Sequence, residues 1–187
     1  MNTGTVSVRY AKALLQYAVE LGQEEKVYAE MQILSLRLTH VHAIRERLSD
    51  PTVSDDAKCI LLETAVTDGK EPASQALSKF FRLVIGSGRG DMLVFMATSY
   101  MDLYRKRNGI VPVQLITAAP VGDERRERLK QLIETVEHGT LEWTHLVDPR
   151  LEGGFVLQID GYRLDASVAS RLQRIRKELI EKNNRII

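Results

Sequence analysis

A glycine-rich loop is the first stretch of the sequence that could do chemistry. Residues 86–90 read Gly-Ser-Gly-Arg-Gly, and glycine-rich loops can hold phosphate groups with their backbone amides. The stretch departs from both phosphate-binding patterns, because no Lys-Ser/Thr pair follows and Asp91 stands where GxGxxG has its third glycine. It also separates two predicted helices instead of following a strand. We interpret it as a solvent-exposed connection, with a nucleotide-handling enzyme as an alternative.

The histidines are the second candidate, for a metal site. His40 and His42 are two residues apart, so on a helix they point to different faces, and no cysteine lies near them. His138 and His145 flank a loop and a strand. We therefore predict no metal. No motif surrounds a serine, a cysteine or a carboxylate pair, so we predict neither a catalytic residue nor a cofactor.

The composition argues against several classes of partner. The 26 Lys and Arg residues balance 25 Asp and Glu residues, so no overall charge attracts nucleic acid or an anionic membrane. A single cysteine, Cys59, excludes an internal disulfide framework and fits a reducing compartment. No apolar run approaches the ~18 residues of a membrane span. If the protein works at a membrane, partners must hold it there.

Helical periodicity dominates residues 1–107, which predicts a bundle of about six helices. The first helix, at residues 5–22, is apolar around more than half of its circumference. Either both of its sides are buried in the bundle, or one side is core and the other receives a partner helix. Further helices are expected at residues 24–39, 41–48, 54–68, 73–85 and 91–107.

From residue 108 the periodicity becomes that of strands, so we place a domain boundary there. Residues 108–187 predict the order β-α-β-β-β-α, a small sheet with two helices on it. Gly153 and Gly154 permit backbone angles that a side chain forbids, and Asp165 is suited to cap the last helix. The expected fold class is therefore two-domain α+β, a six-helix bundle followed by this small domain.

The last helix is strongly basic. Its positive charge can form a solvated face, dock an acidic helical partner or bind nucleic acid, although no interleaved aromatic residues support base stacking. The basic residues are Arg171, Arg174, Arg176, Lys177, Lys182 and Arg185.

The sequence resembles a known family along almost its whole length. Arg-Tyr-Ala-Lys-Ala-Leu at residues 9–14 looks like the opening helix of the delta subunit of bacterial F-type ATP synthases, called OSCP in mitochondria. Further matches are residues 48–51, Gly88, Arg89, Tyr100, residues 117–120, Asp148, Pro149, Leu151, Gly153, Gly154, residues 165–168 and Leu172. Two positions depart from the pattern: Glu152, where the family usually has an apolar or small residue, and Trp143, which is bulkier than expected.

The resemblance implies a stator subunit without enzymatic activity. It would link the peripheral stalk to the catalytic head, so that the head does not rotate with the rotor. Residues 1–107 would bind N-terminal segments of the α subunit, and residues 108–187 the far end of the b subunits. One monomeric copy per complex is implied, peripheral to the cytoplasmic face of the bacterial plasma membrane, with no nucleic acid bound. A nucleic-acid-binding adaptor is the second alternative.

The resemblance also suggests where the α segment binds, because the family uses its first and fifth helices. As a hypothesis, the face comprises Val8, Ala11, Leu15 and Ala18 of the first helix with Leu77 and Phe81 of the helix at residues 73–85. The core then takes Tyr10, Leu14, Tyr17 and Leu21. Gly153, Gly154 and Asp165 are assigned a structural role in the joint that leads into the last helix.

Overall fold

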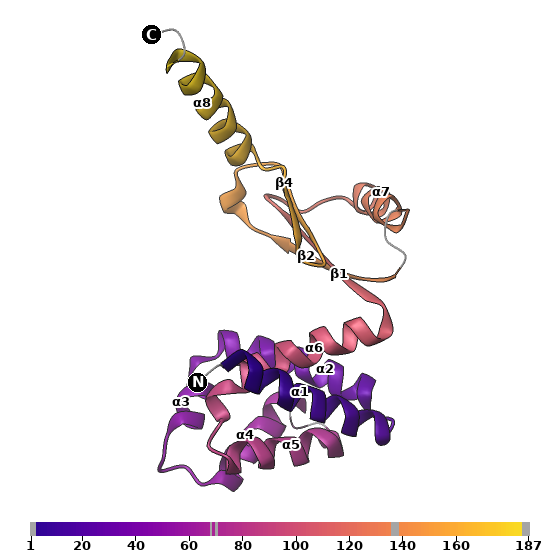
Figure 1. The fold of residues 1–187 in the computed structure, drawn as a ribbon, viewed down its shortest axis with the longest axis vertical. Helices are drawn as coiled ribbons and strands as arrows, with labels where there is room; N and C mark the ends of the chain where they lie inside the picture. Colours follow the sequence, from indigo (N-terminus) through magenta and orange to yellow (C-terminus); the bar gives the residue numbers. More distant parts are fainter. Residues whose placement is uncertain (1–2, 68, 70, 136–138, 185–187) are drawn as a thin grey trace. The chain divides into compact units, whose positions relative to one another are not determined.

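The computed structural model describes residues 3–67, 69, 71–135 and 139–184. The chain divides into two compact units, Met1–Arg107 and Asn108–Ile187. The first is helical and the second combines a sheet with helices (Figure 1). The expected mixed α+β fold is confirmed.

The first unit is built from α-helices joined by short connections. In order along the chain, these are α1 (Thr3–Glu20), α2 (Glu24–His40), α3 (His42–Ser49), α4 (Asp55–Thr67), α5 (Gln75–Gly86), the short 3-10 helix η1 (Gly90–Met92) and α6 (Leu93–Asn108). The expected end of the fourth helix at Asp68 lies outside the described residues.

Helix α5 packs against α1 and α4 and has the clearest apolar face in this unit. Leu77, Phe81 and Val84 on this face are fully buried. The helix begins at Gln75, two residues later than expected, because Ser74 caps it by accepting a hydrogen bond from Leu77 N at 3.4 Å. This start sets which α5 residues face the core and which remain on the surface.

The second unit follows the predicted order of elements. These are β1 (Ile110–Thr117), α7 (Asp123–Glu134), β2 (Thr140–Val147), the 3-10 helix η2 (Pro149–Leu151), β3 (Phe155–Ile159), β4 (Tyr162–Asp165) and α8 (Val168–Asn184). The strands lie in the order β2-β1-β3-β4. β1 and β2 are parallel, whereas β3 is antiparallel to both β1 and β4. Parallel pairing of β1 and β2 requires a crossover, which α7 supplies.

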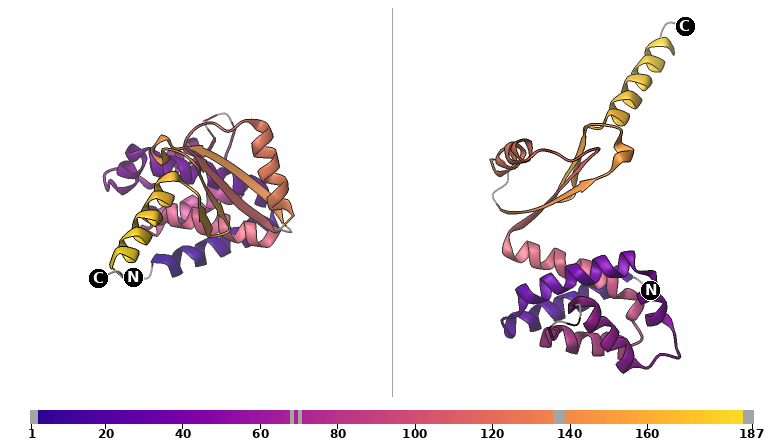
Figure 2. Two further views of the ribbon diagram at one scale, coloured as in Figure 1. Left: turned by 90° about the horizontal axis from the view of Figure 1, so that it is seen from above. Right: turned by 180° about the vertical axis from the view of Figure 1, so that it is seen from behind.

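The core of this unit lies between α7 and one face of the sheet. Val113, Leu115 and Leu157 of the strands pack with Ile133 of α7. Helix α8 does not cover the sheet in the way expected: it extends away from the strands (Figure 2), and Val168, Leu172 and Ile175 are 41%, 58% and 51% exposed. The prediction that both helices pack on the sheet is therefore wrong for α8, whose apolar stripe is left exposed by the described residues of the second unit.

Each of the two departures from the family pattern carries a local cost in this unit. Glu152 ends η2 with a φ of 58°, a left-handed conformation that a small residue adopts with less strain. Trp143 packs against the core cluster of the sheet. Its indole Nε1 is buried and meets no hydrogen-bond partner among the described residues, which is a cost of placing a large ring with a polar edge there.

Candidate functional site

The glycine-rich loop serves as a helix cap and does not form a phosphate site. Gly88 has a φ of 66° and its amide donates to Ile85 O at 2.8 Å, while Arg89 N donates to Val84 O at 3.0 Å. This pair of bonds closes the C-terminus of α5 in a Schellman motif. The amides are thus occupied, and the helix end carries a partial negative charge that disfavours phosphate. The geometry gives no support to a nucleotide-handling enzyme.

The part of the chain that the structure describes contains neither a metal-binding site nor a reactive thiol. No group of three His, Cys, Asp or Glu residues converges there. His145 contacts Thr117 instead, with 2.9 Å between Nε2 and Oγ1, and His138 lies outside the described residues. Burial raises the pKa of the Cys59 thiol, which makes it unreactive. Among the described helices, none is long and apolar enough to cross a membrane.

A groove between α1 and α5 is the candidate site of the first unit. Its volume is about 220 Å³. Each helix contributes four residues at the spacing i, i+3, i+4, i+7, so two parallel stripes form its walls. The lining residues are Tyr10, Ala13, Leu14 and Tyr17 from α1, and Ala76, Lys79, Phe80 and Leu83 from α5.

The residues predicted to bind the α segment lie elsewhere. Ala11, Ala18, Leu77 and Phe81 are fully buried, so in this structure they belong to the core and not to an exposed face. Val8 is 38% exposed and Leu15 is half-buried, and neither lines the groove. The two helices named in the hypothesis do form a groove. Four of the six residues predicted to bind the α segment, however, face the core of the unit.

The structure also differs from the prediction for the α1 residues that were expected in the core. Only Leu14 is buried; Tyr10 and Tyr17 are half-buried and Leu21 is exposed. Small alanine side chains let α1 approach its neighbours closely, so they suit the interior. A tyrosine carries a hydroxyl that needs a polar partner, which favours the edge. In the folded protein, the bonded hydroxyls of the tyrosines distinguish the outer stripe from the inner one.

Each of the two tyrosines of the groove accepts a hydrogen bond from a basic side chain. Lys79 Nζ donates to the Tyr17 hydroxyl at 2.7 Å. Arg89 donates to the Tyr10 hydroxyl, which itself donates to Ser87 Oγ at 3.5 Å. These hydrogen bonds with Ser87 and Arg89 lower the pKa of Tyr10. Between the two contacts Leu83 stands 58% exposed on the surface, so the groove has an apolar centre and cationic ends.

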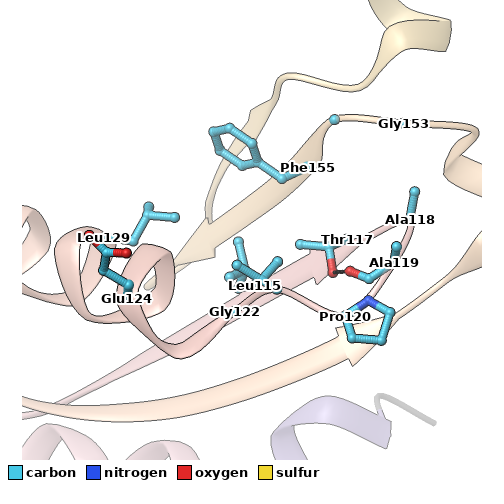
Figure 3. A pocket seen from close by; sticks show the side chains of 12 residues that line it. Leu115, Thr117, Ala118, Ala119, Pro120, Gly122, Glu124, Leu129, Gly153 and Phe155 are labelled. Atoms are coloured by element: carbon cyan, nitrogen blue, oxygen red, sulfur yellow. Dashed lines mark hydrogen bonds between the residues drawn. The ribbon is translucent and has the colours of Figure 1, made fainter.

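A larger hollow in the second unit is the second candidate site (Figure 3). It has a volume of about 680 Å³ and mostly apolar walls. Its loop is fixed by Thr117, which is buried and donates from Oγ1 to Ala119 O at 2.7 Å. The hollow is lined by Leu115, residues 117–122, Glu124, Leu129, Gly153, Gly154 and Phe155.

Gly153 and Gly154 lie between η2 and β3, and both approach the segment that leads from β4 into α8. A Cβ on Gly154 would come within 2.3 Å of Ala166 O, and one on Gly153 within 3.0 Å of Val168 Cγ2. The same segments are bonded to each other, with Ala166 N donating to Phe155 O at 2.9 Å. This close approach supports the structural role assigned to both glycines.

The cap of α8 differs by two residues from the prediction. The hydroxyl of Ser167, a buried residue, accepts from Ser170 N at 3.3 Å, and α8 begins at Val168. Asp165 supports this cap, because its Oδ1 accepts from Ser167 N at 3.0 Å. The hydrogen bonds with Ser167 lower the pKa of Asp165 to about 2. Asp165 thus holds the capping residue and is not itself the cap.

Helix α8 presents its exposed apolar stripe beside basic residues. Arg171 and Arg174 are exposed next to the stripe formed by Val168, Leu172 and Ile175. An apolar stripe at helical spacing suits a partner helix better than a nucleic-acid backbone. Of the other basic residues, Arg176 and Lys177 are exposed as well, and Arg185 lies outside the described residues.

Comparison with known proteins agrees with the resemblance of the sequence. Residues 6–179 match the family described as "ATP synthase delta (OSCP) subunit". The chain is 41% identical to "ATP synthase subunit delta" of Phocaeicola vulgatus and 42% identical to that of Bacteroides fragilis, over the full length of each pair. A chain in the structure of the Toxoplasma gondii mitochondrial ATP synthase hexamer has a similar fold, with a TM-score of 0.71, 23% identity and coverage of 93% of this chain and 97% of that one. The protein therefore belongs to the ATP synthase delta (OSCP) subunit family, the non-catalytic subunits of the peripheral stalk in F-type ATP synthases.

Proposed function

We propose that this stator subunit joins two partners through two separate units. The first unit binds an N-terminal segment of the α subunit in the groove between α1 and α5, and the second binds the b subunits of the stalk. One copy serves each complex, at the cytoplasmic face of the bacterial plasma membrane. The groove carries this proposal, because its paired stripes have the spacing with which a groove receives an amphipathic helix.

The physical task explains why such surfaces are needed where no catalytic constellation is found. A stator must resist the torque that would turn the head with the rotor, which requires contacts that hold firmly. Burying an apolar side chain such as Leu83 contributes about 1.5–3 kcal/mol. Several such anchors in a preformed groove give a stiff contact, since little of the protein has to be reordered on binding.

The second unit offers two apolar surfaces for the b subunits. One is the hollow beside Phe155 and the loop at residues 117–122 (Figure 3). The other is the stripe of α8, where Leu172 is more than half exposed. An exposed stripe at spacings of four and three residues fits the packing of one helix against another. We assign both surfaces to the stalk.

Titration of the full chain with a synthetic N-terminal peptide of its own α subunit tests the groove. Leu83→Asp should weaken binding at least about tenfold, because it replaces the apolar anchor of the groove with a carboxylate that must lose its water when the peptide binds. Leu36→Asp on α2 is the matched control, since Leu36 is 61% exposed and lies outside the groove. Absence of binding at ~100 μM peptide, a threshold of about −5.5 kcal/mol, would contradict the proposal.

A further inference from the structure

We infer that the helix received by the groove between α1 and α5 carries two carboxylates seven residues apart, one for each cationic end of the groove. This inference rests on the proposed function of the groove and adds the charge pattern of its partner. Lys79 beside Tyr17 forms one end, and Arg89 beside Tyr10 forms the other.

Among the residues that the structure describes, no carboxylate pairs with the cations at these two ends. Within the described residues, the ion pairs of the protein lie elsewhere, on α6, on α7 and around η2 and β4. Lys79 and Arg89 instead donate to the neutral tyrosine hydroxyls. A cation bonded to an uncharged oxygen is not neutralised by it, so the cation still attracts an anion.

The composition of the two helices adds to the positive field. α1 contains Arg9, Lys12 and the single acidic residue Glu20, while α5 contains Lys79 and Arg82 and no acidic residue. Arg9 lies close enough to Tyr10 to contribute to the lowering of that tyrosine's pKa. An acidic partner is therefore attracted to this surface, and a basic one is repelled.

The spacing of the carboxylates follows from the geometry of a helix. Tyr10 and Tyr17 are seven residues apart on α1, which is about 10.5 Å at 1.5 Å per residue. A partner helix lying along the groove presents its own residues i and i+7 at the same interval and on the same face. Positions i+3 and i+4 then fall over the apolar centre at Phe80 and Leu83. The expected pattern is acidic, two apolar residues at i+3 and i+4, then acidic again.

Three designed helical peptides test this pattern on the full chain. All share the same apolar pair at i+3 and i+4, and they carry Glu, Gln or Lys at both i and i+7. The Glu peptide should bind about four- to twenty-fivefold more tightly than the Gln peptide, from about two- to fivefold per ion pair, and the Lys peptide should bind most weakly. The advantage of Glu over Gln should shrink between ~0.05 M and ~0.5 M salt.

Variants of the protein test which cations cause the preference for the Glu peptide. Lys79→Gln and Arg89→Gln should each remove about half of the advantage on a logarithmic scale, whereas Arg45→Gln, at an exposed position of α3 outside the groove, should leave it unchanged. Equal binding of the Glu and Gln peptides, with Leu83→Asp still abolishing both, would overturn the charge pattern and leave the groove as a docking site. Failure of every peptide, the α segment included, would overturn the docking site as well.

Discussion

Gly154 touches the backbone that leads into α8: a Cβ there would lie 2.3 Å from Ala166 O and 2.9 Å from Ser167 Cα. Its φ of 78° adds a second obstacle to any side chain. Gly154→Ala should therefore destabilise the second unit by about 2–4 kcal/mol. Chemical denaturation followed at Trp143, which lies in this unit, measures the change.

Gly122→Ala is the control for that substitution. Gly122 lines the same hollow but has a φ of −61°, and a Cβ there meets nothing within 4 Å. Its effect should stay below about 1 kcal/mol, the usual scale for a helix-capping position. Similar losses at both positions would show that the contact of Gly154 with Ala166 is not what fixes the joint.

Asp165 gives the start of α8 a dependence on pH. Its pKa of about 2 in the folded protein lies below the ~3.9 of an unfolded chain, so the ionised form stabilises the folded state. This stabilisation is fully present above pH ~4 and is lost as the pH falls toward ~2. NMR titration of the Asp165 carboxyl should give a midpoint near the lower value, and Asp165→Asn should remove the pH response of the Ser167 amide. A midpoint near ~4 would refute the hydrogen bond to Ser167 N.

At single positions, the sequence carries a stronger local signal for the two glycines than for the buried face of α1. Gly153 and Gly154 have a strong local signal, because adjacent glycines before a strand indicate a close backbone approach. Ala11 and Tyr10 give no such signal: both stripes of α1 are apolar, and only the neighbouring helices decide which one is buried. The hydroxyl of Tyr10, bonded to Arg89, identifies the outer stripe only once the fold is known.

At the scale of elements, α2 holds the N-terminus of α5 and thereby one wall of the groove. Glu30 is 5% exposed, and its carboxylate accepts from both the amide at 2.8 Å and the hydroxyl of Ser74, the capping residue of α5. Gln23 adds a bond from Ala76 N at 3.3 Å. The position of α5 therefore depends on a buried polar contact that spans 44 residues of sequence.

Removing this carboxylate should loosen the first unit. Glu30→Ala leaves the Ser74 amide buried without an acceptor, which costs about 1–3 kcal/mol. Because Ser74→Ala acts on the same cap, the double variant should lose less than the sum of the two single losses. Urea unfolding measures all three, and Glu46→Ala on exposed α3 should change little. Strict additivity would mean that Glu30 and Ser74 act independently.

The helices and strands themselves were predictable because their signals are local. Periodicity, caps and turn residues such as Asp160-Gly161 depend on neighbours in sequence, and that turn is present between β3 and β4. The placement of α8 was not predictable in this way. The apolar spacing of Leu172 and Ile175 in the sequence is the same whether their own sheet or another subunit covers them. The contact between Glu30 and Ser74 was equally hidden, since nothing local links these positions.

For the molecule as a whole, division into two compact units predicts that the two binding activities can be separated. Leu83→Asp changes only the groove of the first unit, and Gly154→Asp disrupts only the joint of the second. Effects at sites without shared contacts add independently. Leu83→Asp should therefore lose the α peptide and keep a soluble C-terminal fragment of b, while Gly154→Asp should keep the peptide and bind the fragment at least about tenfold more weakly.

Calorimetry on the full-length chain with each ligand measures both activities in one protein. The double variant should lose both partners, and each single variant should retain one. Each variant then serves as the folding control for the other, because a retained activity shows that its unit is intact. If Gly154→Asp also abolished binding of the α peptide, the two units would be coupled, because a change next to the start of α8 would then have altered binding in the first unit. A stator must bind both partners at once. Either single variant should therefore uncouple the head from the stalk while leaving the other contact in place.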